Sequence, residues 1–246
     1  MWVGVASIFP SMFGALTGEG VVARAIAAHT LTLDIENPRD HAEDRHATVD
    51  DRPYGGGPGM VMKAEPLLRA IAALKQRAGG SVRTIYMSPQ GKRLTQAKVE
   101  ALAQQQRLLF VAGRYEGIDE RVVDAAVDEE LSLGDFVVTG GELPVMVVVD
   151  AIARHLPGTL GNAESVQAES HRAGLLDWPH FTRPERLDDA AVPAVLLGGD
   201  HAAIEGWRLT AALGRTYQRR PDLLAGRRLS ARERVLLTDY LTSAQR

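Results

Sequence analysis

The 246-residue sequence contains no cysteine. Disulfides, thiolate nucleophiles and thiolate-bound metal sites are therefore excluded, and the composition is typical of a reducing compartment. No apolar run approaches the roughly 20 residues that a membrane-spanning helix needs. The first residues carry no basic region before Pro10, so the pattern does not indicate a secretory signal. We therefore expect a cytoplasmic protein with no membrane partner.

The common nucleotide-binding and hydrolase motifs are also missing. There is no G-x-x-x-x-G-K-[ST] loop, and no G-x-G-x-x-G follows an expected strand. Both absences argue against a metabolic nucleotide-binding enzyme with a doubly wound sheet. The seven histidines are scattered, so a structural zinc site is not expected. Ser88 and Ser132 lack the sequence context of a nucleophile elbow.

Positive charge is scarce overall but gathers near the carboxyl terminus. The formal net charge is −3, yet residues 201–246 carry nine arginines against four acidic residues, a local net charge of +5. This asymmetry is typical of a basic part that meets a polyanion beside an acidic body. A solvated helical surface would show the same pattern, and charge alone does not decide between them.

Hydrophobic periodicity predicts strands that alternate with helices over the first 155 residues. Such alternation is typical of an α/β fold with a mostly parallel sheet and helices on both faces. A polar stretch ending at Gly55–Gly59 has neither period, and a long loop in a compact domain is usually functional or disordered. The expected strands are 2–8, 31–35, 82–87 and 108–112, and the expected helices are 20–28, 63–77, 94–104 and 145–155.

The rest of the chain reads as a connector followed by helices. Residues 157–184 show no clear period, whereas 202–213 are helix-like and 221–225 form a turn. A last helix begins at Ser230, where Ser230 and Glu233 make a capping-box pattern. We therefore divide the chain into a main domain (1–160), a linker (161–180) and a small helical domain (181–246).

The segment Gly113–Pro144 is unusual in composition. Glycine loops at 113–117 and 139–141 flank a stretch in which nine acidic residues face only two arginines. Glycine allows positive φ and close approach to the main chain, so these loops predict a pocket with backbone walls for a flat small molecule. The acidity disfavours phosphate and favours a cation or a metal. Tight turns between strands and helices would also use these glycines.

Five segments resemble one known family, and they occur in the family's order. They are RHATVDDRPYGGGPGM (45–60), YMSPQG (86–91), GRYEGIDER (113–121), SLGDFVVTGGELP (132–144) and GLLDWPHFTRPE (174–185). Together they resemble the bacterial tRNA (guanine-N1-)-methyltransferases, the TrmD family of the SPOUT class. The resemblance runs nearly end to end. It implies an α/β domain with a deep trefoil knot, which no periodicity would predict because knots are so rare, and a small C-terminal helical domain.

In the family, the loops of the knot hold S-adenosylmethionine, a cationic sulfonium. Backbone groups of such loops can read the edge of an adenine ring. By match, 1–160 becomes the donor-binding catalytic domain and 181–246 a tRNA-binding domain. The implied cofactor-binding residues are Tyr86, Ser88, Pro89, Gly113, Tyr115, Gly117, Ser132, Leu133, Gly134, Asp135, Phe136, Val137, Val138, Gly140, Gly141 and Pro144.

Methylation of guanine N1 requires a proton acceptor at N1 and a cation near O6. The family uses an arginine after the knot, matched by Arg154, and an aspartate in the connector. Here the connector position is Glu169, in Glu-Ser-His where the family has Asp-Ser-Phe. The added methylene loosens the placement of the carboxylate, to which catalysis is sensitive. We predict Glu169 as the general base; a solvated loop acid is the alternative.

The resemblance also implies Mg²⁺, for which Glu116 is the candidate ligand because magnesium prefers oxygen donors. A helix-start acid favoured by the helix dipole is the alternative for Glu116. The implied substrate is the anticodon stem-loop of tRNA, methylated at the guanosine 3′ of the anticodon (position 37), and the implied assembly is a homodimer in which the partner supplies Glu169. Candidate tRNA contacts are His46, Asp50, Arg52, Tyr54, Gly55, Gly59, Asp177, Arg183, Arg208 and Arg215.

Two other functions stay open from the sequence. Another SPOUT-class enzyme could methylate a different base or a ribose, although a ribose methylator would not need an acid and an arginine at a base edge. A non-catalytic RNA-binding module could keep the glycine loops only as turns. Binding of the methyl donor separates the second alternative from the enzymes.

Overall fold

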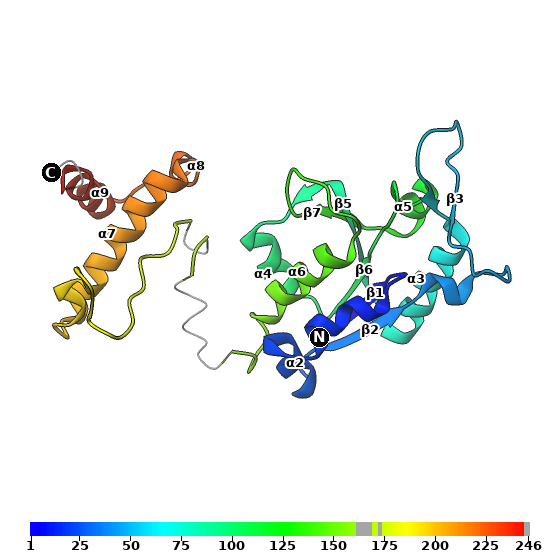
Figure 1. Ribbon diagram of the computed structural model, residues 1–246, viewed down its shortest axis with the longest axis horizontal. Helices are drawn as coiled ribbons and strands as arrows, with labels where there is room; N and C mark the ends of the chain where they lie inside the picture. The colour runs from blue at the N-terminus through cyan, green and yellow to red at the C-terminus, as the bar shows by residue number, and fades with distance from the viewer. Residues whose placement is uncertain (161–168, 172–173, 244–246) are drawn as a thin grey trace. The chain divides into compact units, whose positions relative to one another are not determined.

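The computed structural model describes residues 1–160, 169–171 and 174–243. It divides into two compact units, Met1–Gly161 and Asn162–Arg246, which we describe separately (Figure 1). The first eight residues of the expected linker, and residues 172–173, lie outside the described part. Among the described residues, no helix is both long and apolar enough to cross a membrane.

Unit 1 is built on a five-stranded sheet in the order β2-β1-β6-β5-β7. Every neighbouring pair is parallel. The mostly parallel α/β fold predicted from the periodicity is therefore confirmed. The strands are β1 (Trp2–Ala6), β2 (Thr32–Glu36), β5 (Arg83–Arg93), β6 (Arg107–Val111) and β7 (Glu129–Ser132).

Successive strand residues point to opposite faces of the sheet. Both faces of this sheet are apolar, and helices cover both of them. In β6, Leu108 and Phe110 pack into one apolar cluster, and Leu109 and Val111 pack into the other. The first cluster is shared with α1 (Gly14–Thr17), α2 (Gly20–Ala27), α4 (Gln96–Ala103) and α6 (Glu142–Ala153). The second is shared with α3 (Ala64–Ala78) and α5 (Glu120–Ala126).

Strand β5 continues beyond the expected 82–87 and includes part of a segment expected as a loop. Its pairing with β7 stops at Met87 and resumes at Lys92, so an irregular stretch lies within the strand. Gly91 sits so close to β7 that an added Cβ would lie 2.5 Å from the Glu130 carbonyl carbon. Only glycine fits at this position. Because it lets the backbones of β5 and β7 come into contact, the pairing of the two strands resumes at Lys92.

The acidic middle of 113–144 contains two elements that its sequence pattern does not indicate, α5 and β7. Asp119 caps α5 by accepting a hydrogen bond from the Arg121 N–H. β7 is short, and its first residues, Glu129 and Glu130, are charged, so apolar periodicity cannot reveal it. Tertiary contacts with β5 stabilise this strand.

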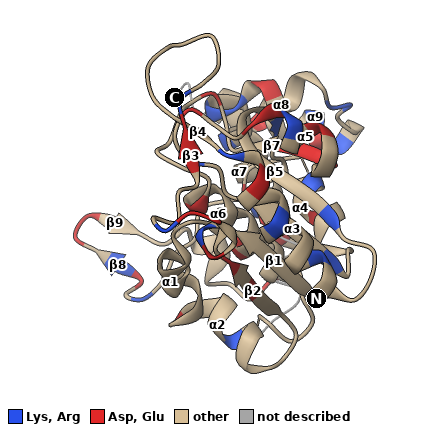
Figure 2. Ribbon diagram, turned by 90° about the vertical axis from the view of Figure 1, so that its right-hand side faces the viewer, with Lys and Arg blue, Asp and Glu red and all other residues tan. Residues whose placement is uncertain are grey.

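The polar stretch before α3 contains a 3-10 turn (Pro38–His41) and the hairpin of β3 (Asp50–Asp51) with β4 (Val61–Met62). Figure 2 shows the acidic residues of β3. Gly55, Gly56, Gly57 and Gly59 all adopt positive φ between the two strands. β4 bridges to the 113–117 loop, because Met62 pairs with Ile118.

The described residues of unit 2 form a small hairpin, a 3-10 turn (Ala194–Leu196) and three α-helices. The strands and α-helices are β8 (Arg186–Leu187), β9 (Ala190–Ala191), α7 (His201–Arg219), α8 (Pro221–Ala225) and α9 (Ala231–Ser243). α7 packs closely on α9, since a Cβ at Gly214 would lie 2.4 Å from the Tyr240 ring. The capping box is confirmed: the Ser230 N–H donates to Glu233, and the Glu233 N–H donates to the Ser230 hydroxyl.

Candidate functional site

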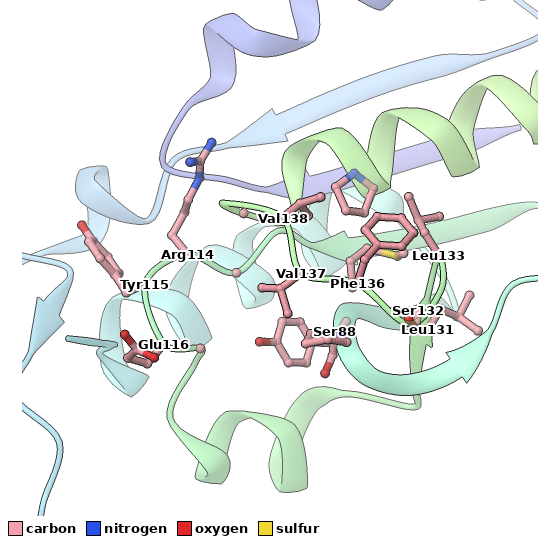
Figure 3. Close-up of a pocket in the computed structure, with 18 residues that line it drawn as sticks. Ser88, Arg114, Tyr115, Glu116, Leu131, Ser132, Leu133, Phe136, Val137 and Val138 are labelled. Carbon is pink, nitrogen blue, oxygen red and sulfur yellow. The ribbon is translucent and has the colours of Figure 1, made fainter. Parts of the chain in front are cut away.

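A cavity of about 740 Å³, including its open mouth, lies at the carboxyl ends of β6 and β7, beside the irregular part of β5. Ligands of open α/β sheets bind at the carboxyl ends of parallel strands, where loops diverge. Its walls come from the irregular part of β5, the loop after β6, the segment after β7 and the start of α6. Figure 3 shows Arg114, Tyr115 and Glu116 on one side and Leu131, Ser132 and Leu133 on the other.

Glycines allow the two loops of this cavity to touch. The Gly141 N–H donates to the Gly113 carbonyl oxygen over 2.8 Å. A Cβ at Gly141 would lie 2.7 Å from the Ala112 Cα, and one at Gly140 would lie 2.3 Å from Arg114 Nε. Real Cβ atoms do not come so close to a backbone atom, so Gly141 is needed for packing, whereas at Gly140 the Arg114 side chain would have to move.

All but two of the predicted cofactor-binding residues line this one cavity; Gly134 and Asp135 do not. Asp135 is highly exposed and forms an ion pair with Arg93 over 2.5 Å. Met87, Arg114 and Leu131 also line the cavity, and sequence reasoning missed them. The sequence did offer evidence for Arg114, because it lies between two predicted cofactor-binding residues, Gly113 and Tyr115, in the matched GRYEG loop.

The expectation of an acidic cavity is wrong. Glu116 is the only carboxylate among the lining residues. Glu129 instead pairs with Lys98 and Arg83, at 2.5 and 2.9 Å. Burial raises the pKa of Glu129, but hydrogen bonds and charge from Lys98 and Arg83 outweigh it and hold that pKa below its ordinary value. Asp119, Asp135 and Glu142 of this segment also form ion pairs, and none of the four lines the cavity.

One of these carboxylates, Glu142, is fully buried behind the cavity wall. It accepts a hydrogen bond from Arg114 Nε over 2.8 Å and another from the Ser7 hydroxyl over 2.8 Å. The Arg114 guanidinium lies over the Phe9 ring, 4.5 Å from its centroid. Residues from three parts of the chain are thereby joined at one end of the sheet.

Two tyrosines border the cavity. Burial and the nearby charge of Glu130 raise the pKa of Tyr86, although a hydrogen bond with the Ile118 backbone opposes them. Burial and a hydrogen bond with Asp50 also raise the pKa of Tyr115. Tyr115 therefore connects the cavity to β3, which belongs to the predicted tRNA-binding stretch.

Glu116 is not a helix-start acid, because α5 begins at Glu120 with Asp119 as its cap. Its side chain packs against Gly59, where an added Cβ would lie 2.3 Å from Glu116 Oε1. The Glu116 N–H donates to the Met60 carbonyl oxygen over 3.0 Å. Within the described ranges, no three His, Asp or Glu side chains gather where they could share a metal ion.

The predicted tRNA contacts of unit 1 lie on one continuous polar segment. Tyr54 is fully exposed at the glycine loop, and His46 and Arg52 are also exposed. Asp50 is half-buried beneath Tyr115, and Gly55 and Gly59 form the loop itself. Arg154 lies elsewhere in unit 1, at the carboxyl end of α6.

Unit 2 has a pocket of about 750 Å³ that brings together Glu169, Asp177 and Arg208. The Arg208 guanidinium lies 4.9 Å from the centroid of the Trp178 ring and pairs with Glu205 over 2.8 Å. Trp178 is a lining residue that sequence reasoning missed, although it stands within the matched segment 174–185. Arg183 and Arg215 do not line this pocket.

Comparison with known proteins gives a consistent match over almost the whole chain. The family model described as tRNA (Guanine-1)-methyltransferase TrmD matches residues 1–226. A Pseudomonas paraeruginosa protein named tRNA (guanine-N(1)-)-methyltransferase is 57% identical over 98% of this chain and 96% of its own. Proteins of the same name from Pseudoalteromonas translucida and Aeromonas hydrophila are 53% and 54% identical, over 100% and 98% of this chain and 96% and 97% of their own.

Proposed function

The chain belongs to the tRNA (guanine-1)-methyltransferase family, and we propose that it methylates N1 of a guanosine in tRNA. More finely, we propose S-adenosylmethionine as the donor and the guanosine 3′ of the anticodon as the target. The observation that carries the proposal is the cavity itself: three separate matched segments, which sequence resemblance assigns to the donor, form one continuous wall.

The cavity suits this donor chemically. Its walls combine glycine backbone, which can hydrogen-bond an adenine edge, with the apolar side chains of Leu131, Leu133 and Val138. Arg114 is its only cationic lining residue, and that charge is paired with Glu142. A phosphate ligand would find no free cation in this wall. When bound, the donor supplies an electrophilic methyl group.

The chain's own residues then handle the proton and the developing charge. Glu169 accepts the N1 proton of guanine, and Arg154 stabilises the negative charge that builds on O6. Glu169 lines a pocket together with Trp178, Arg208 and three leucines, and with the charged side chains of Asp177, Glu205 and Arg232. Such a setting suits a flat base held by stacking.

Glu116 remains our candidate for a magnesium contact, and no step is assigned to the ion. The carboxylate lines the donor cavity beside Gly59. One side chain supplies one ligand, so water and substrate oxygens would complete the shell, as is usual for magnesium.

The arginines of unit 2 would hold the tRNA through its phosphates, which position RNA without reading its sequence. The exposed polar segment around Tyr54 would lie against the anticodon loop. We further propose that the enzyme is a homodimer in which Glu169 of one subunit serves the donor cavity of the other; this part rests on the resemblance.

The central test is methyl transfer itself. Labelled S-adenosylmethionine, magnesium and unmodified tRNA are incubated with the protein, and the modified nucleotide is mapped. We expect 1-methylguanosine beside the anticodon. A methylated ribose or another base would contradict the assignment of substrate, and failure to bind the donor in calorimetry would leave only an RNA-binding module.

Shared sites are tested with mixed dimers. Glu169→Gln removes the base, and Gly141→Ala weakens donor binding, so each homodimer should show little activity at a donor concentration near the wild-type Kd. A mixed dimer contains one Glu169→Gln subunit and one Gly141→Ala subunit. If Glu169 acts across the interface, both defects fall in one of its two sites and the other site is intact. Separately tagged, co-purified mixed dimers should then recover activity. If Glu169 acts within its own subunit, each site keeps one defect and no activity returns.

A further inference from the structure

The buried ion pair behind the donor cavity joins three segments that are far apart in sequence. Ser7 follows β1, Arg114 follows β6, and Glu142 opens α6. The Glu142 side chain is 0% exposed and that of Arg114 is 17% exposed. Two hydrogen bonds of 2.8 Å hold the three side chains together.

Stability alone is a weak reason for such a pair. Removing two charges from water costs free energy, and apolar residues of similar volume are often as stabilising. A pair of this kind supplies a fixed position instead. Arg114 Nη1 also donates to the Thr139 carbonyl oxygen over 3.3 Å, so the guanidinium ties the 113–117 loop to the 139–141 loop.

The pair also sets the charge of the cavity wall. Arg114 is the only Lys or Arg among the residues that line the cavity. With Glu142 beside it, the pair carries no net charge. Without Glu142, an unpaired guanidinium would remain next to the ligand and would repel any cation bound there.

We propose that Glu142 is a positioning residue for the donor cavity. Through Arg114 it holds the two glycine loops at their working separation, and it cancels a charge that would oppose a sulfonium ligand. This inference rests on the proposed function of the cavity, since it takes S-adenosylmethionine as the ligand.

A pair of ligands that differ in one charge tests the inference directly. S-Adenosylmethionine carries the sulfonium, and S-adenosylhomocysteine is the neutral thioether of nearly the same shape. Calorimetry measures the Kd of each for the wild type and for Glu142→Gln, which keeps the shape and loses the charge. We expect the Kd of the sulfonium to rise about tenfold and that of the thioether by about threefold or less.

Equal losses for the two ligands, or none, would overturn the role of Glu142 in balancing charge. Glu36→Gln is the matched control, because Glu36 also pairs with an arginine, Arg77, but that arginine does not line the cavity, whereas Arg114 does. It should leave both Kd values unchanged. If the wild type binds neither ligand, the proposed donor is wrong, which is a different result from unchanged binding by the variant.

A second variant covers the case in which Glu142→Gln does not fold. Arg114→Leu combined with Glu142→Leu removes both charges together, which avoids an uncompensated buried charge. The tie to Thr139 is then lost while no cation remains, so both ligands should weaken by similar factors. If the double variant binds both ligands with wild-type affinity, the Arg114–Glu142 pair does not position the glycine loops for donor binding.

Discussion

The proposed donor cavity of unit 1 and the Trp178 pocket of unit 2 have similar volumes, about 740 and 750 Å³ with their open mouths included. Their walls differ in kind. Glycine backbone forms much of the first, and its loops touch so closely that side chains are excluded. Charged and aromatic side chains form the second, and glycine does not line it.

This difference predicts where substitution should be tolerated. A backbone wall requires that Cβ atoms be absent, so adding one should disrupt it. A side-chain wall should accept one residue in place of a similar one, such as the glutamate at 169 where the resemblance implies an aspartate. If one region binds the donor and the other serves catalysis and RNA binding, a variant in one region should leave the function of the other unchanged.

The largest effect is expected from Glu169→Gln. The amide cannot accept the N1 proton, so the rate of methyl transfer should fall on the order of 10² to 10⁴-fold, the usual contribution of a general base. Single-turnover transfer measures the rate, and calorimetry should show unchanged donor binding. Glu169→Asp, which restores the family residue, should stay active. Turnover close to wild type in the Gln variant would remove Glu169 from the mechanism.

Gly141→Ala should affect the donor cavity more than the fold. Its Cβ would lie 2.7 Å from the Ala112 Cα, so the two loops would have to move apart by roughly 1 Å, and a misplacement of that size can cost on the order of 100-fold in a positioned site. We expect the donor Kd to rise by about that factor. Gly226→Ala is the matched control, because nothing lies within 4 Å of its added Cβ. Similar donor affinities for the two variants would contradict a backbone-built wall.

Trp178→Ala should weaken tRNA binding and leave the donor Kd unchanged. Stacking of a base on an aromatic ring is worth a factor of roughly 5 to 100, so the KM for tRNA should rise within that range. Leu187→Ala, on the exposed β8–β9 hairpin, serves as control. If both variants bind tRNA like the wild type, the pocket has no part in substrate binding.

The smallest effect is expected from Glu129→Gln, which tests the structural role of the acidic segment. Because Lys98 and Arg83 lower the pKa of Glu129 below 4.5, its stabilisation is present above about pH 4.5 and is lost as the pH falls through the lowered value. The variant should melt about 3 °C lower at pH 7, and the difference should vanish in acid. Donor affinity should not change. Weaker donor binding by the variant would show that Glu129 contributes to the donor site.

Periodicity located the parallel sheet and most of its helices, because strands buried on both faces are strongly apolar. It failed at α5 and β7, where charged residues dominate and contacts with β5 create the strand. It also stopped β5 at residue 87, since the resumption at Lys92 depends on backbone contact across Gly91. The deep knot stays a prediction of the resemblance.

The candidate site shows the same limit. Matched motifs placed most of the cavity's lining correctly within one wall, yet they also included Asp135, which turns outward to Arg93. Composition suggested an acidic cavity, but only Glu116 lines it, and Asp119, Glu129, Asp135 and Glu142 pair with basic residues instead. The number of charged residues in a segment does not show which way their side chains point, because that orientation depends on partners from distant segments.

By itself, the sequence determined the fold class, the family and the loops that form the cavity, because apolar periodicity and glycine positions are local properties of the chain. The tertiary structure alone decided which acids face a ligand, that Trp178 and Arg208 stack, and that Ser7, Arg114 and Glu142 meet. Those outcomes depend on side chains up to 135 positions apart, and contacts at such separations exist only once the sheet has formed.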